Sequence, residues 1–108
     1  MRFLSITACA ALLASCATTA GTPPAVLGAA PFYQKHVDAM GIPILASSRV
    51  PDEALFAARD MMRGMLAHRP DLAEWLAAND YRVALIARDE ALLDLPENAH
   101  WTKPARDD

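Results

Sequence analysis

The chain has 108 residues and a formal net charge of −3, from 10 Lys and Arg against 13 Asp and Glu. This acidic balance disfavours nucleic acid as a partner, because nucleic-acid binding calls for a basic surface. The length fits one small domain. Both cysteines, Cys9 and Cys16, lie near the N-terminus, so the rest of the chain has no disulfide framework.

The first 16 residues have the build of an export signal. Arg2 precedes an apolar run from Phe3 to Ala14. At about a dozen residues this run is too short to span a bilayer, and it matches the apolar region of a secretory signal. It leads into Leu-Ala-Ser-Cys at 13–16, which resembles the lipobox of bacterial lipoproteins. The resemblance implies that Cys16 Sγ takes a diacylglycerol, that the chain is cut before Cys16, and that the new amine receives a fatty acid such as palmitate.

Lipidation of Cys16 would determine the cellular location of the protein. Two or more acyl chains hold a protein stably in a membrane, so we expect a lipid-anchored protein of the bacterial cell envelope. Ala17 follows the cysteine at a position where, in Gram-negative lipoproteins, Asp would favour the inner membrane. The resemblance therefore implies the outer membrane, facing the periplasm. The alternative is an ordinary signal peptide cut later, for example after Ala20, with Cys16 incidental.

Removal of residues 1–15 leaves 93 of the 108 residues, with 9 Lys and Arg against 13 Asp and Glu, a net charge of −4. No free thiol then remains for a disulfide, a metal or a nucleophile. Residues 16–31 are small and uncharged, which predicts a lipidated cysteine and a flexible tether. The alternative is an extended arm that packs along the domain through Val26 and Leu27. Residues 32–98 are expected to form a small α/β domain, and residues 99–108 an irregular tail.

A short helix and a strand are the first elements expected in the domain. Phe32, His36 and Met40 recur at helical spacing, which predicts a helix over 32–40 that Gly41 ends. The apolar run 42–47 then predicts a buried strand, with a proline near its start, where a missing N–H is tolerated.

Residues 51–66 predict the longest helix. Pro51 suits the first helical position, and the two acidic residues after it favour the positive end of the helix dipole. The apolar stripe of this helix consists of Ala54, Leu55, Ala58, Met61, Met62, Met65 and Leu66. We interpret Met61 and Met65 as core residues, because methionine fills irregular gaps in cores. The alternative is a copper site or an adaptable binding site.

The second half of the domain completes one crossover. Residues 71–78 predict a helix that buries Leu72, Trp75 and Leu76. Residues 81–87 are apolar on both faces and predict a central strand. The order strand, helix, helix, strand predicts an α/β fold with a single βαβ unit, which is a short parallel sheet with packed helices and a right-handed crossover.

The expected core is incomplete. Parallel strands are usually covered on both faces, and only residues 91–95 and 32–40 are available for the second face. We therefore expect a protein partner, a further C-terminal region or self-association to complete it.

No residue set carries catalytic chemistry. His-Glu-x-x-His and a Gly-rich phosphate loop are both missing, so we predict no metal, no cofactor and no catalytic residue in this chain. Ser47 and Ser48 end a predicted strand without a Gly-x-Ser-x-Gly elbow, and we interpret them as caps of the following helix. Asp89, Glu90 and Asp94 follow a strand, where α/β folds place ligand residues, and we interpret them as a solvated turn.

The histidines are similarly uninformative. His36, His68 and His100 are evenly spaced, but their surroundings do not match. We interpret His36 as a residue of a helix surface or core, and His100 with Trp101 as part of a tail that packs its one aromatic ring.

Five segments between residues 42 and 100 carry a further resemblance: Ile-Leu-Ala-Ser-Ser (44–48), Val-Pro-Asp-Glu-Ala-Leu (50–55), Met-Leu-Ala-His-Arg-Pro-Asp-Leu (65–72), Tyr-Arg-Val-Ala-Leu-Ile (81–86) and Asp-Leu-Pro-Glu-Asn (94–98). They resemble the N-terminal part of secreted bacterial and fungal proteins similar to the zincin-like metallopeptidase domain of anthrax lethal factor. The resemblance implies an α/β scaffold beside a substrate cleft. The zinc-binding helix of that group has no counterpart here, so no catalytic or metal residue is implied.

These observations lead to one functional hypothesis and one alternative. The hypothesis is a lipid-anchored envelope protein whose α/β unit is the scaffold subdomain of a metallopeptidase-like protein and is not catalytic alone. The alternative is a complete small lipoprotein that acts as a binding or self-associating module.

Overall fold

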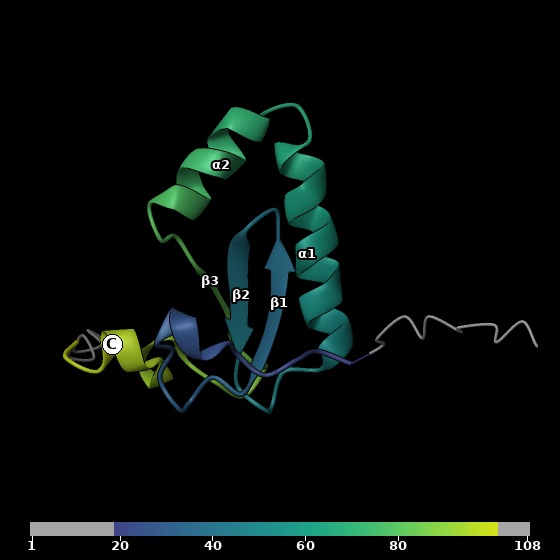
Figure 1. Cartoon of the computed structure of the whole chain (residues 1–108). Helices are drawn as coiled ribbons and strands as arrows, with labels where there is room; N and C mark the ends of the chain where they lie inside the picture. The colour runs from purple at the N-terminus through teal and green to yellow at the C-terminus, as the bar shows by residue number, and fades with distance from the viewer. Residues whose placement is uncertain (1–18, 102–108) are drawn as a thin grey trace, which may run out of the picture.

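The computed structural model describes residues 19–101, so the predictions for the signal segment and for Cys16 lie outside the described residues. A three-stranded mixed sheet carries two packed helices, which confirms the predicted α/β class with its parallel pair (Figure 1). Within residues 19–101, no helix is long and apolar enough to cross a membrane.

The parallel pair is formed by β2 (Ile42–Ala46) and β3 (Val83–Leu85), joined through α1 (Asp52–Leu66) and α2 (Pro70–Ala78). The predicted helices and the first predicted strand therefore lie close to their expected ranges. The prediction of a central strand over 81–87 is wrong, because only three residues of this stretch pair with β2 and the strand order is β1-β2-β3. The central strand is β2, and β3 lies at an edge.

The predicted helix over 32–40 is also wrong, because β1 (Lys35–Ala39) is an antiparallel partner of β2. Ala39 lies opposite Ile42, so the hairpin turn contains only Met40 and Gly41. Both turn residues have positive φ, 54° and 84°, as a two-residue hairpin turn of the favoured twist requires. The glycine that was expected to end a helix therefore reverses a hairpin.

The core lies on both faces of β2. On the helix-bearing face, Ile44 and Ala46 pack with Leu55 of α1, and all three side chains are fully buried. On the opposite face, Leu45 packs against Tyr33 and Leu95. The second face of the sheet, for which the sequence offered little cover, is thus partly covered from within the chain.

The cover comes from the segment before β1, which includes a short 3-10 helix, Ala25–Leu27. The amide of Ala20 donates to Asp52 Oδ2 (3.1 Å), and Leu27, Ala29 and Ala30 pack around the buried Tyr33. In its described part, the stretch predicted as a flexible tether follows the alternative of a packed arm through Leu27, whereas Val26 is exposed. Two further 3-10 helices, Leu92–Asp94 and Pro96–Asn98, lie on the same side (Figure 1).

Each helix buries only part of the apolar stripe expected for it. In α1, Leu55 and Leu66 are buried, whereas Met61 and Met65 are 67% and 77% exposed. In α2, Ala73 is buried and Leu76 packs beside it. The prediction that Leu72 and Trp75 are buried is wrong, because both are exposed. The interpretation of Met61 and Met65 as core residues is wrong, because α1 packs mainly on β1 and β2 and leaves its β3 side uncovered.

Candidate functional site

The tertiary structure brings together two groups of predicted site residues at the C-terminal ends of the parallel strands. Ser47 follows β2 and is buried, and its Oγ donates to Glu90 Oε1 at 3.0 Å. The same carboxylate oxygen accepts the amide of Ala87 at 2.8 Å. The hydroxyl of Ser47 also accepts the amide of Arg49 at 3.3 Å.

This arrangement joins two loops. A serine nucleophile needs an adjacent general base that takes its proton. The Ser47 hydroxyl donates a hydrogen bond to the Glu90 carboxylate, and the same carboxylate oxygen also accepts the amide of Ala87. The interpretation of Ser47 as a helix cap is wrong, because α1 has no side-chain cap and Pro51 occupies its N-cap position. Ser47 instead ties the β2–α1 loop to the loop after β3.

The other predicted acidic residues have local partners. Asp89 forms an exposed ion pair with Arg49 at 2.8 Å, and Asp94 Oδ2 accepts the amide of Ala91 at 2.7 Å. Ser48 is exposed in the loop before α1. Within residues 19–101, no group of three or more metal-ligating side chains of His, Cys, Asp or Glu comes together.

The histidines occupy separate places. His36 lies in β1, where its amide donates to the carbonyl of Gly21 at 2.8 Å. His68 and His100 are exposed, and Trp101 beside His100 is 50% exposed. The prediction that the tail packs its aromatic ring therefore holds only in part.

A polar cluster that the sequence did not indicate closes the second face of the sheet. Tyr33 is 4% exposed, and its hydroxyl donates to Glu97 Oε2 at 2.5 Å across 64 residues of sequence. Burial, and then the hydrogen bond to the Glu97 carboxylate, raise the pKa of Tyr33 well above its usual range. A cavity of about 250 Å³ adjoins this pair and also borders Leu45 and Ala84.

The raised pKa of Tyr33 predicts a loss of stability in alkali. A group whose pKa is higher in the folded state contributes stability below its unfolded pKa, about 10 for tyrosine, and loses it as the pH rises further. We expect the free energy of unfolding to fall above this pH, and to fall less in Tyr33→Phe. Urea titrations of residues 17–108 at pH 8 and pH 11 measure the difference.

The matched control is Tyr81→Phe, because Tyr81 is 51% exposed. This variant should retain the alkaline loss of the unsubstituted chain. Equal alkaline losses in Tyr33→Phe and the unsubstituted chain would contradict the assignment to Tyr33.

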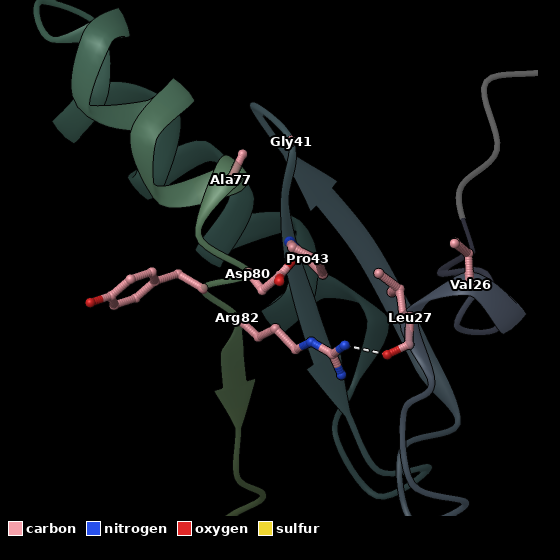
Figure 2. Close-up of a pocket in the computed structure, with 8 residues that line it drawn as sticks. Val26, Leu27, Gly41, Pro43, Ala77, Asp80 and Arg82 are labelled. Atoms are coloured by element: carbon pink, nitrogen blue, oxygen red, sulfur yellow. Dashed lines mark hydrogen bonds between the residues drawn. The ribbon is translucent and has the colours of Figure 1, made fainter.

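A smaller cavity, of about 190 Å³, lies between the N-terminal segment and the start of β3. Figure 2 shows Arg82 reaching past Pro43, with its guanidinium donating to the carbonyl of Leu27. This hydrogen bond fastens the N-terminal segment to the second face of the sheet. Arg82 is thereby engaged as a structural link.

An extended apolar surface of the described residues is a groove between α1 and β3, which we call the α1–β3 groove. It encloses about 460 Å³, and no charged side chain lines it. Its lining consists of Val50, Ala54, Ala57, Ala58, Met61, Met62, Met65, Val83, Leu85 and Ile86. Met61, Met65 and Ile86 are exposed there, although all three are large apolar side chains. An exposed apolar surface of this kind is typical of a contact with a partner.

Helical periodicity assigns Met61 and Met65 to the core because they share a helical stripe with Leu55 and Leu66, but of these four only the two leucines are buried. One feature of the sequence was consistent with exposure of some of these side chains. Residues 54–66 contain more large apolar side chains than a short sheet can cover. Comparisons with protein-family models, with curated proteins and with solved structures find no match for this chain.

Proposed function

We propose that this chain is a lipid-anchored envelope protein whose α/β unit serves as a scaffold and does not carry out catalysis by itself. The lipobox at 13–16 is the observation that carries the anchoring. The α/β unit supports the scaffold role through its polar side chains, since Ser47, Glu90 and Tyr33 are all engaged in contacts that hold loops together.

On the basis of the resemblance to the zincin-like group, the proposed scaffold forms one wall of a substrate cleft in a metallopeptidase-like protein. The edge position of β3 is compatible with that role, because an edge strand can border a cleft. Sequencing the DNA next to the gene tests this form. The absence of any adjacent segment with His-Glu-x-x-His would remove its main support.

The anchor has a direct test in which Cys16→Ser is compared with Cys9→Ser. In bacteria fed a fatty-acid probe, Cys16→Ser should abolish labelling and move the protein from the membrane fraction to the soluble fraction, because the acyl chains supply the membrane affinity. Cys9→Ser is the matched control, since Cys9 lies in the segment expected to be removed. It should leave labelling unchanged. Membrane association that persists in Cys16→Ser would contradict the proposal.

The alternative, a self-associating module, is favoured by one specific observation. The α1–β3 groove and the edge strand beside it form one continuous uncovered surface.

A further inference from the structure

One edge of the sheet is partly covered by another segment of the chain, and the other edge is open. At the β1 edge, the N-terminal segment adds a bridge, in which the amide of His36 donates to the carbonyl of Gly21. At the β3 edge, Figure 1 shows no strand beyond β3. Within residues 19–101 and apart from the ladder with β2, no backbone–backbone hydrogen bond involves residues 82–86. An uncovered edge of this kind is a template for another strand.

Apolar surface continues from this edge onto the helix-bearing face. Val83 and Leu85 of β3 form one wall of the α1–β3 groove, and Ile86 extends it beyond the strand. Met61 and Met65 line the opposite wall, and they are the most exposed large apolar side chains of α1. An occupant of this surface must therefore supply a strand edge together with apolar side chains.

The charges that flank β3 identify the occupant. Asp80 lies four residues before Ala84, and Arg88 lies four residues after it. Both side chains are exposed, and neither belongs to an ion pair among the described residues. Asp80 and Arg88 lie in the turns before and after β3. Antiparallel pairing of two copies of β3 therefore brings the acidic turn of one copy to the same end as the basic turn of the other. In that pairing, Asp80 of one copy approaches Arg88 of the other, and the contact occurs twice.

We propose that the α1–β3 surface binds a second copy of this chain, through antiparallel pairing of the two β3 strands about a two-fold axis at Ala84. In this register Val83 lies opposite Leu85 of the second copy. Parallel pairing in register would instead place Arg82 opposite Arg82 and Arg88 opposite Arg88, and like charges directly opposite each other are destabilising. The antiparallel contact also closes on itself, since the same patch is used twice.

The paired strands form one six-stranded sheet. A two-fold axis perpendicular to the sheet keeps both α1 helices on the same face, so the two α1–β3 grooves join across the seam. Met61 and Met65 of the two copies then face each other across the joined strands. This inference rests on the alternative function, the self-associating module, and names its partner as a second copy of the chain.

Cysteine cross-linking in the cell envelope tests the pairing on the full chain. A disulfide needs Cα atoms about 4.4–6.8 Å apart, and directly opposite residues in an antiparallel pair are about 4.5–5.5 Å apart. Ala84→Cys should therefore give a disulfide-linked species with twice the mass of one chain in membrane samples treated with a mild oxidant. Ser48→Cys, an exposed position away from β3, should remain a single chain, as should the unsubstituted chain.

The register has its own test. Val83→Cys coexpressed with Leu85→Cys should cross-link, because these residues lie opposite each other in the proposed register. Val83→Cys alone should cross-link less, because the two copies of residue 83 are offset by two residues along the strand, about 7 Å, in addition to the spacing between the strands. Cross-linking of Val83→Cys alone at the level of the mixed pair would overturn the antiparallel register.

The same membrane samples are labelled with the fatty-acid probe, which separates the two proposals. If Ala84→Cys cross-links no more than Ser48→Cys while the label is present, the second-copy inference is overturned and the anchor stands. If the label is absent, the anchor is overturned, and the doubled mass of Ala84→Cys still reports on the pairing.

Discussion

Leu55→Ala should lower the free energy of unfolding by about 2–5 kcal/mol, the range for removing a buried leucine and leaving a cavity. Leu55 is fully buried and joins α1 to the central strand through Ile44 and Ala46. Small domains have total stabilities of only about 5–15 kcal/mol, so this one substitution removes a large share. Urea unfolding of residues 17–108, followed by circular dichroism, measures the loss.

Leu92→Ala is the matched control for this experiment. It removes the same atoms from a side chain that is 52% exposed, and surface substitutions usually change stability by less than about 0.5 kcal/mol. A Leu55→Ala variant as stable as Leu92→Ala would show that α1 does not pack on the sheet as described.

Tyr33→Ala should cost about 3 kcal/mol or more, as expected for the truncation of a buried aromatic side chain. Tyr33 holds three parts of the chain on the second face of the sheet. It packs against Leu45 of β2 and Leu95, and its hydroxyl is bonded to Glu97. Its removal should free the N-terminal segment, so that amides before β1 exchange faster with solvent while those of α1 change less.

Two further variants separate the contribution of the Tyr33 ring from that of its hydrogen bond and from the general effect of removing a tyrosine. Tyr33→Phe keeps the ring and loses the hydrogen bond, which by itself is worth about 1 kcal/mol in a typical case. Tyr81→Ala removes a tyrosine that is half exposed and packs against Trp75 at 5.6 Å between ring centroids. If Tyr33→Ala were no more destabilising than Tyr81→Ala, the second face of the sheet would not be part of the core.

The elements predicted correctly are those with strong local signals. Pro51 and Pro70 lie at helix starts, since a proline lacks the amide hydrogen that those positions do not use. The apolar run of β2 also needed no information beyond itself, because a strand buried on both faces is apolar throughout. The α/β class and the crossover follow from these elements.

The errors concern elements that depend on distant partners. The segment Lys35–Ala39 becomes a strand because β2 is there to pair with it and because Met40 and Gly41 adopt a hairpin turn. Residues 81–87 have the composition of a central strand, but three of them pair and the outer edge stays open. Pairing is a property of two segments, and the composition of one segment does not contain it.

The candidate site shows the same division. The reactive residue types that sequence reasoning singled out, Ser47 and Glu90, do meet, yet as a bond between two loops. The surface that now carries the proposal, around Met61, Met65 and Ile86, was assigned to the core. Helical periodicity identifies an apolar side, but it cannot say how far a neighbouring sheet extends beneath it.

The sequence by itself determined the acidic charge, the two helices, the apolar strand that becomes β2 and the fold class, because composition and local patterns are enough to give each of them. Only the tertiary structure decided which edge of the sheet is covered, which apolar side chains remain exposed, and that Tyr33 meets Glu97. These outcomes depend on contacts between segments separated by up to 64 residues. Such contacts are selected by the packing of the whole chain, so local patterns leave them open.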